Sequence, residues 1–369
     1  MPRPLDILAI EPFYGGVRRA VLECVARHSR HRWRVLKLPP RRIERRLAVA
    51  ANWFGEHLGR HAAERVDLLL TSEALNLANL LRLVPALAAV PTVVYFHDNQ
   101  LLPPTDPAAA RRGSDRDGPL DLVNLNSAQA ATEVWFNSVY HRQAFFALAR
   151  AVVDRHPELA GRDPLAGIRD KARLVRPPVD VSAVDAVRRG PDRPDRRPRT
   201  LFVDTRDAHV PLLNAAVGVL RRKRVAFDLL TVGPTDALDP LVVRKAIPEH
   251  DDAAQLRGMF TAAAFLSVRP SAPCDYQALR ALAAGCRPVL PSAGVYPELL
   301  PPALHAGGLY PVDPTSLADR IALAVGLDAP AWYPDDARPA QVPFDPVAQC
   351  KLIDDRLDAV AAAHAPRAA

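Results

Sequence analysis

The sequence contains no run of about eighteen or more apolar residues, so we do not expect a hydrophobic helix that crosses a membrane. Cysteine is also scarce. Cys24, Cys274, Cys286 and Cys350 are widely spaced and form no metal-binding doublet, which predicts four reduced, mostly buried thiols. The first residues, MPRPLDILAIEPFYGG, lack the layout of a signal peptide, and we therefore expect a cytoplasmic protein without stable membrane association.

The composition is that of a folded protein with a basic surface. With 369 residues the chain is too long for one ordinary core and fits two domains. The net charge is +7, and arginine far outnumbers lysine. A GC-rich genome explains most of this bias, but a polyanionic partner is permitted. Each basic cluster taken singly, RRIERR (41–46), ARRGSDR (110–116) or RRKR (221–224), is typical of a solvated surface.

Short apolar segments alternate with helical patterns along the first half of the chain. Strands are predicted over 5–13, 32–39, 66–72, 91–97 and 134–138, and helices over 14–28, 45–64, 75–87, 122–133 and 139–156. This alternation favours parallel strands joined by helical crossovers, which is a doubly wound α/β layer.

The segment 188–199 interrupts the alternation because it is charged, rich in proline and without apolar residues. Beyond it, strands are predicted over 200–206, 227–233, 264–270 and 287–292, and helices over 210–225, 253–263, 275–285, 314–326 and 345–364. We therefore predict an α/β protein with two Rossmann-like domains facing a central cleft. The domains are 1–187 and 200–345, joined by a linker, 188–199; a C-terminal helix, 346–369, is expected to pack back on the first domain.

Polar residues follow directly on the apolar strand TVVYF: His97, Asp98, Asn99 and Gln100. Ligands of doubly wound sheets bind outside the carboxyl ends of the strands, so these side chains are expected at a site. Gly15 and Gly16 stand between the first strand and the first helix. They make a tight turn, and a turn without side chains also lets backbone amides approach a diphosphate.

Four segments together resemble a known family: IEPFYGGVRRA, YFHDNQLLPP, VWFNSVYHRQAF and GVYPELLP. They are similar to the tRNA-queuosine α-mannosyltransferases, a group of the family 4 retaining glycosyltransferases with the two-domain GT-B fold. The resemblance implies transfer of mannose from GDP-mannose to queuosine in tRNA-Asp, with retention at the anomeric carbon. It also implies that no metal or other cofactor is needed, because the departing diphosphate accepts the proton of the acceptor.

The resemblance also implies roles for individual residues. His97 matches the active-site histidine, which holds the transferred sugar or the acceptor hydroxyl. The candidate acceptor-binding residues are Tyr14, Arg18, Arg19, Asp98, Asn99 and Gln100. The candidate donor-binding residues are Gly15, Gly16, Arg206 and Glu298, together with Asp275, Tyr276 and Arg280 from the segment in which the sequence departs from the family. Arg18 and Arg19 stand where the family tends to show histidine and lysine. Asn137 and Ser138 match a further motif, in which Ser138 could equally cap a helix.

The second half departs from the family at the paired glutamates that contact donor sugar and ribose. Ala272 and Arg280 occupy these positions, and Pro211 replaces a basic residue. A guanidinium only donates hydrogen bonds and cannot replace a carboxylate that accepts them. Three alternatives follow: a different donor, compensation by a residue such as Asp275, or loss of donor turnover. Two rival functions stay open. The first is a family 4 enzyme with another donor and a small-molecule or lipid acceptor; a lipid acceptor would favour a basic amphipathic helix, and RRIERRLAVAANWFGEHL (41–58) has some of that character. The second is a non-catalytic tRNA-binding relative.

Overall fold

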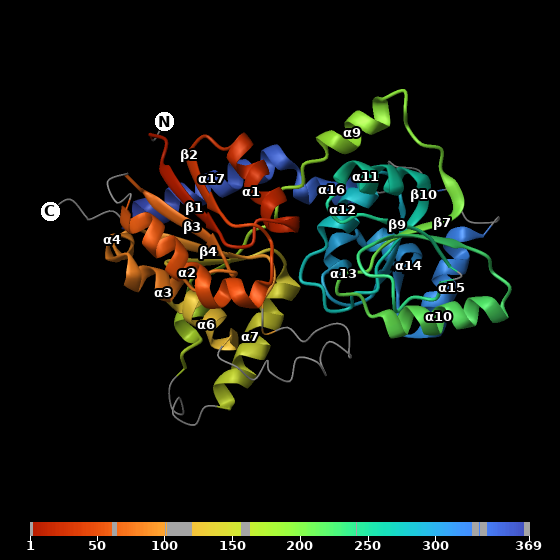
Figure 1. The fold of residues 1–369 in the computed structure, drawn as a ribbon, viewed down its shortest axis with the longest axis horizontal. Coiled ribbons are helices and arrows are strands. Elements are labelled where there is room, and N and C mark those ends of the chain that lie inside the picture. Colours follow the sequence, from red (N-terminus) through yellow and green to blue (C-terminus); the bar gives the residue numbers. More distant parts are fainter. Residues whose placement is uncertain are drawn as a thin grey trace. The chain divides into compact units, whose positions relative to one another are not determined.

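Two parallel six-stranded sheets organise the chain in the computed structural model (Figure 1). The structure describes residues 3–60, 65–99, 101, 120–155, 163–240, 242–326, 332 and 338–364. These residues divide into two compact units. Unit 1 takes the described residues up to 179 together with those from 344 onward, and unit 2 takes those from 180 to 343. The predicted α/β fold class with two doubly wound domains is confirmed.

The sheet of unit 1 has the strand order β2-β1-β3-β4-β5-β6, and every neighbouring pair is parallel. Its strands are β1 (Asp6–Glu11), β2 (Arg32–Lys37), β3 (Leu68–Ser72), β4 (Thr92–Phe96), β5 (Glu133–Phe136) and β6 (Ala172–Leu174). The order reverses between β1 and β3. Such a switch point opens a crevice at the carboxyl edge of the sheet, because the connections on its two sides run in opposite directions.

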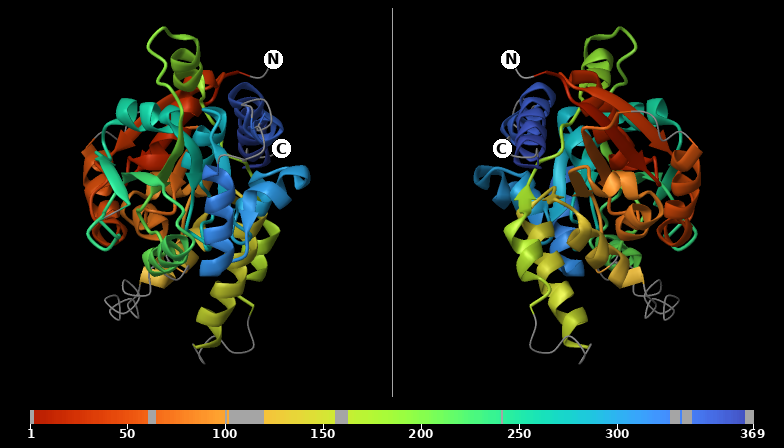
Figure 2. Two further views of the ribbon diagram at one scale, coloured as in Figure 1. Left: turned by 90° about the vertical axis from the view of Figure 1, so that its right-hand side faces the viewer. Right: turned by 90° about the vertical axis from the view of Figure 1, so that its left-hand side faces the viewer.

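Helices cover both faces of this sheet, because successive strand residues point to opposite sides. Leu8 and Ile10 face a core built with α2 (Ile43–Arg60), α3 (Leu77–Leu83), α4 (Pro85–Ala88), α6 (Leu120–Ala130), α7 (Val139–Asp154) and α8 (Ala166–Asp170). Ala9 faces the opposite side, which α1 (Gly16–His28) and the long C-terminal helix α17 (Pro346–His364) cover. Figure 2 shows α17, in dark blue, on this side of the sheet.

The sheet of unit 2 has the order β12-β11-β10-β7-β8-β9, with its switch point between β7 and β10. Its strands are β7 (Arg197–Asp204), β8 (Asp228–Val232), β9 (Val243–Ile247), β10 (Ala262–Leu266), β11 (Arg287–Pro291) and β12 (Leu309–Tyr310). Helices α10 (Val210–Arg222) and α15 (Pro314–Val325) pack on one face, and α11 (Asp252–Thr261) and α12 (Tyr276–Ala283) on the other. The remaining elements are α9 (Ser182–Arg189), α13 (Tyr296–Leu299), α14 (Pro302–Gly308), α16 (Arg338–Gln341) and a 3₁₀ turn, Val342–Phe344.

The chain crosses from unit 1 to unit 2 between residues 179 and 180, earlier than the predicted linker at 188–199. The difference arises from helix α9, which was not predicted because the sequence around it is highly charged. Arg188 of α9 donates to the carbonyl of Ala283, and the amide of Asp180 donates to the hydroxyl of Tyr276, so this segment belongs to unit 2. The extended part of the predicted linker is confined to 190–196, because β7 begins at Arg197.

Buried Asp354 fastens α17 to the loop that follows α1. Its carboxylate accepts hydrogen bonds from the Ser29 hydroxyl at 2.6 Å and from the Arg30 amide at 2.8 Å. These two donors are separated from Asp354 by most of the sequence, yet they lie in the same unit. Unit 1 therefore contains both ends of the described chain.

We expect Asp354→Ala to destabilise unit 1 by about 1–3 kcal/mol, because it leaves two polar donors of the α1–α17 junction without their acceptor. The control is Asp355→Ala, which removes only an exposed ion pair with Arg30 and is worth about 0–1 kcal/mol. Urea unfolding followed by circular dichroism measures both. Equal midpoints for the two variants would contradict this role of Asp354.

Candidate active site

Polar residues from four neighbouring strands meet at the carboxyl edge of the unit 1 sheet. Glu11 ends β1, Glu73 follows β3, His97 follows β4 and Asn137 follows β5. All four are buried. Because Glu11 and Glu73 lie on the two sides of the switch point, this cluster occupies the place where doubly wound sheets bind ligands.

Glu73 joins the elements of this cluster. Its carboxylate forms an ion pair with Arg18 of α1 and accepts hydrogen bonds from the backbone amides of His97 at 3.0 Å and Asp98 at 3.1 Å. The Asn124 side chain in turn donates to the Glu73 carbonyl at 3.0 Å. Sequence reasoning missed Glu73, although it follows an apolar strand just as His97 does.

The imidazole of His97 is neutral. Burial and the neighbouring Arg18 cation lower its pKa well below the ordinary histidine value. Its exposed fraction is 6%, and its Nδ1 has no hydrogen-bond partner among the described residues. A buried nitrogen without a partner is costly, so a ligand hydroxyl that paired with it would bind favourably.

A second buried histidine fixes the loop after β4. The Nδ1 atom of His141 lies 2.9 Å from the Asn137 oxygen, and its Nε2 atom lies 2.8 Å from the Asn99 amide nitrogen. Asn137 uses its own amide to donate to the His97 carbonyl, so its oxygen is the acceptor and His141 carries its proton on Nδ1. Burial lowers the pKa of His141 to about 3, which keeps this ring neutral as well.

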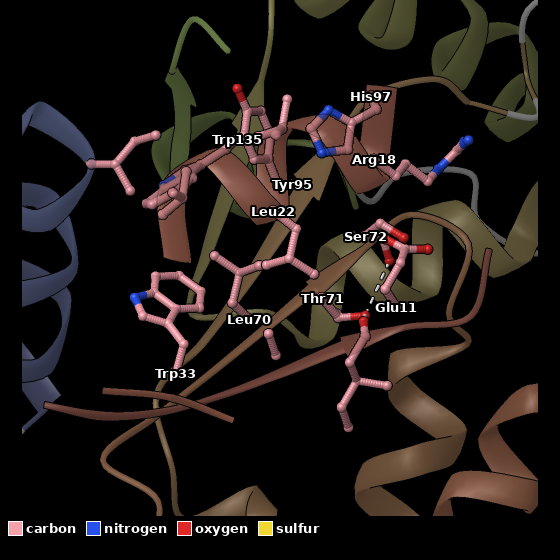
Figure 3. Close-up of a pocket in the computed structure, with 15 residues that line it drawn as sticks. Glu11, Arg18, Leu22, Trp33, Leu70, Thr71, Ser72, Tyr95, His97 and Trp135 are labelled. Carbon is pink, nitrogen blue, oxygen red and sulfur yellow. Dashed lines mark hydrogen bonds between the residues drawn. The ribbon is translucent and has the colours of Figure 1, made fainter. Parts of the chain in front are cut away.

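A narrow cavity extends from this cluster between the sheet and helices α1 and α17. In Figure 3 the indole rings of Trp33 and Trp135 lie on one side of it, and Glu11 and Arg18 lie on the other. Its volume is about 20 Å³, which is room for about one water molecule. The cavity is therefore too small for a sugar.

Glu11 is a buried carboxyl group with an unusual protonation equilibrium. Burial raises its pKa from 4.5 to about 7, although Arg18 and the hydrogen bond from the Phe13 amide oppose this shift. Glu73 adds a second acidic group, whose pKa burial also raises. Two carboxyl groups thus share one arginine, which favours holding a proton among them near neutral pH.

Gly15 and Gly16 are each required for a different structural reason. A Cβ atom on Gly15 would come within 2.6 Å of Pro40, so only glycine allows this close approach. Gly16, the first residue of α1, has φ = +54°, a conformation that glycine adopts without cost. No side chain therefore covers the α1 amino end at these two positions.

Tyr14 and Arg19 belong to a neighbouring surface cluster. The Tyr14 hydroxyl donates to Glu23 at 2.8 Å, Arg19 pairs with the same carboxylate, and the Lys37 ammonium lies 4.2 Å from the Tyr14 ring centroid. Of the remaining predicted acceptor residues, Asp98 caps its own turn by accepting from the Asn99 amide, and Gln100 lies outside the described residues. Ser138 caps α7 through the His141 amide.

The carboxyl edge of the unit 2 sheet carries two arginines near its switch point. Arg206 follows β7 and binds Asp204 with both ends of its guanidinium, at 2.9 and 2.5 Å. Gly233 makes room for this arrangement, since a Cβ atom there would lie 2.8 Å from Arg206 Cγ. The predicted residue is thus held in place by the protein itself.

Arg269, which sequence reasoning missed, follows β10 on the other side of the switch point. Its Nε atom is buried without a hydrogen-bond partner, and its guanidinium forms no ion pair with a residue that the structure describes. Burial alone would lower its pKa, but Asp275, Tyr296 and Asp204 outweigh burial and raise it above the ordinary arginine value. A permanent, incompletely paired cation therefore stands at this edge.

The other predicted donor residues lie on or before α12 and α13. Asp275 is buried, caps α12 through the Ala278 amide and accepts from the Tyr296 hydroxyl at 2.8 Å, so both of its oxygens are engaged. Tyr276 holds Asp180, Arg280 donates weakly to Gln277 at 3.4 Å, and Glu298 lies in the single turn of α13. Ala272, at the first glutamate position, is buried beneath the Gly294–Val295 turn.

Within the described parts of both units, no three His, Cys, Asp or Glu side chains are arranged to hold a metal ion. None of the described helices is long and apolar enough to cross a bilayer.

Residues 6–179, which include the whole unit 1 cluster, match the model of the tRNA-queuosine α-mannosyltransferase N-terminal domain. The family resemblance seen in the sequence is confirmed. A tRNA-queuosine α-mannosyltransferase of Drosophila melanogaster is 25% identical over 316 residues, which cover 80% of this chain and 81% of that protein. The matched domain contains Glu11, Gly15, Arg18, Glu73 and His97.

Solved structures of glycosyltransferases have the same fold. Anabaena HepE in complex with UDP and glucose aligns with a TM-score of 0.60 at 16% identity, over 96% of this chain and 100% of that one. The catalytic domain of starch synthase IV from Arabidopsis thaliana, bound to ADP and acarbose, aligns with a TM-score of 0.63 at 10% identity, over 97% and 100%. The predicted GT-B fold is therefore confirmed.

The raised pKa of Glu11 predicts how stability depends on pH. Between about pH 4.5 and 7 the folded protein binds the Glu11 proton and the unfolded chain does not, so this group lowers stability as the pH rises. Glu11→Gln keeps the acceptor for the Phe13 amide but cannot titrate. We expect it to remove roughly 2–3 kcal/mol of the loss in unfolding free energy that Glu11 causes between the two pH values. Urea midpoints at pH 5 and 7.5 measure it. His97 and His141, whose pKa values are lowered, change the stability in the opposite direction. Their contributions are the same in both proteins and cancel when the unfolding free energy of the wild type is subtracted from that of the variant. Parallel pH profiles would refute the assignment.

Proposed function

We propose that the protein is a retaining glycosyltransferase that transfers mannose from GDP-mannose to queuosine in tRNA-Asp. The observation that carries the proposal is the neutral, buried His97 with an unpaired Nδ1, held by Glu73 at the carboxyl edge of the matched domain. This ring can accept or donate one hydrogen bond to a hydroxyl group without taking on charge. It is suited to positioning a sugar or diol.

In this proposal unit 2 binds the diphosphate of the donor through its arginines. Arg269 supplies the incompletely paired charge, and Arg206, oriented by Asp204, supplies a second. Fixed positive charge stabilises the negative charge that develops on the departing diphosphate. The diphosphate oxygen takes the proton of the attacking hydroxyl as the new glycosidic bond forms on the same face, so neither a metal nor another cofactor enters this scheme.

A second candidate is a tRNA-binding protein that has lost transfer. It is favoured by Ala272 and Arg280 at the positions of the glutamate pair and by Asp275, whose two oxygens are already engaged within the protein. These features weaken recognition of ribose hydroxyls. A donor other than GDP-mannose would agree with the same observations.

The deciding experiment incubates the purified protein with GDP-mannose and tRNA-Asp that carries queuosine. We expect the digested nucleoside to gain the mass of one hexose in liquid chromatography–mass spectrometry. UDP-glucose and ADP-glucose serve as alternative donors, and tRNA-Asp without queuosine serves as the acceptor control. Tight tRNA binding without any hexose gain from these donors would favour the non-catalytic candidate.

His97→Ala is expected to reduce transfer by at least about a hundredfold, because it removes the group that positions the hydroxyl. The thermal unfolding midpoint is the control for folding, and His28→Ala, an exposed position, is the matched histidine variant. Unchanged kcat in folded His97→Ala would remove His97 from the mechanism.

Arg269→Met is expected to weaken GDP binding about tenfold to a hundredfold, the range for losing a hydrogen bond to a charged group. Calorimetric titration measures the affinity, and Arg257→Met on the exposed side of α11 is the control. Equal affinities for these two variants would show that Arg269 does not contact the diphosphate.

A further inference from the structure

The basic segment between β2 and α2 lies beside the loop of the glycine pair. The amide of Tyr14 donates to the carbonyl of Leu38 at 3.0 Å, and the amide of Leu38 donates to the carbonyl of Glu11 at 3.0 Å. Pro40 packs against Gly15 so closely that a Cβ atom there would be 2.6 Å away. The residues that follow Pro40 therefore enter α2 at the same edge of the sheet as the candidate active site.

Three arginines in this segment are exposed and unpaired. Arg41, Arg42 and Arg45 form no ion pair with any residue in the described part of the chain. Other surface arginines of unit 1 behave differently: Arg3 and Arg65 pair with Asp67, and Arg32 pairs with Asp6. Leaving three arginines unpaired next to one another raises their mutual repulsion, which an anionic partner would relieve.

Further cations continue this positive surface, and few carboxylates interrupt it. Lys37 and Arg19, both exposed, flank Tyr14 on the side of the glycine loop. The nearby carboxylates are Glu23, which Arg19 already neutralises, and Glu44 in the first turn of α2. The net charge of these residues along this edge is therefore positive.

The outward face of α2 adds an aromatic ring. Arg45, Val49 and Trp53 are spaced four residues apart and therefore lie on one side of the helix. Trp53 is 47% exposed, and its ring stacks on His57 with 5.5 Å between centroids and 5° between planes. An exposed indole held flat by a neighbouring ring offers a stacking platform for a nucleobase.

The apolar face of α2 is already occupied. Leu47, Ala50, Ala51, Phe54 and Leu58 are buried, most of them in the core of unit 1. A helix that binds a membrane needs its apolar face for the acyl chains. Of the large apolar side chains of α2, only Val49 and Trp53 are exposed, so the structure argues against this helix as a lipid anchor.

We propose that the α2 basic surface, defined as Arg41, Arg42, Arg45 and Trp53, is a docking surface for RNA. The arginines contact successive phosphates, and Trp53 stacks on an unpaired base. This inference rests on the proposed function, because that function brings an RNA acceptor to the adjoining site. The inference identifies the surface that contacts parts of the RNA other than the reacting nucleoside.

The test measures binding of fluorescently labelled tRNA-Asp, with and without queuosine, by anisotropy between about 50 and 200 mM salt. The variant Arg41→Gln/Arg42→Gly/Arg45→Gln removes three charges. We expect it to bind both tRNAs at least about tenfold more weakly at low salt, and to lower the slope of log K against log salt by about 2–3, since each phosphate contact contributes about 0.7–0.9. Trp53→Ala should weaken binding about fivefold or more and leave the slope unchanged.

The matched control is Arg199→Gln/Arg222→Gln/Arg224→Gly in unit 2, which removes the same charge. Like Arg42, with φ = 51°, Arg224 has a left-handed backbone, with φ = 56°, so each triple replaces one such residue by glycine. Circular dichroism confirms folding of both triples.

Equal tRNA affinity and salt slope for the two triple variants would overturn the inference and leave the proposed function standing. Failure of the wild-type protein to bind any tRNA would instead overturn the proposed function and the inference together. Sedimentation with phosphatidylcholine vesicles containing phosphatidylserine tests the lipid alternative. Binding of the wild type to these vesicles that the α2 triple abolishes, without a change in tRNA binding, would assign the surface to membranes.

Discussion

The carboxylate of Glu73 is the contact on which the unit 1 site depends. Glu73 follows β3, yet its carboxylate binds Arg18 on α1 and the two backbone amides that begin the loop after β4. A buried ion pair is expensive to desolvate, and it persists where additional hydrogen bonds satisfy the remaining lone pairs. Here those additional bonds come from the backbone of His97 and Asp98, so the same interaction neutralises a charge and positions the imidazole.

This arrangement also explains how an arginine can stand at position 18. A buried guanidinium needs a carboxylate, and the structure supplies Glu73 and, more remotely, Glu11. Burial is the main reason that the pKa of His97 is lowered and its ring stays neutral, and the positive charge of Arg18 beside it acts in the same direction. Arg18 therefore acts on the site through the histidine and the carboxyl groups. Its direct contact with an acceptor, which the family resemblance implied, stays a prediction.

The pattern of apolar strands in the sequence predicted most of the fold. The long apolar strands of both units, and the position of His97 at the end of one, followed from the sequence. The missed strands β6 and β12 are three and two residues long, and β9 is the polar segment VRKAI; none of them has an apolar run to detect. Helix α9 was hidden by its charges. Glu73 and Arg269 obeyed the rule that led to His97, a polar residue after a strand. Spacing along the chain alone could not show that their partners would come from other elements.

In the part of the chain that the structure describes, the two crossings between the units have a consequence for how the protein is built. The amide of Val179, where the chain leaves unit 1, donates to the carbonyl of Phe344, where it returns, at 2.9 Å. Departure and return are thus adjacent, and the described part of unit 2, residues 180–343, is in effect an insertion at one point of a single α/β layer. A short glycine-rich bridge between these positions would therefore join the two segments of unit 1 without a large change in their positions. An insertion of this kind can also be exchanged or diverge on its own.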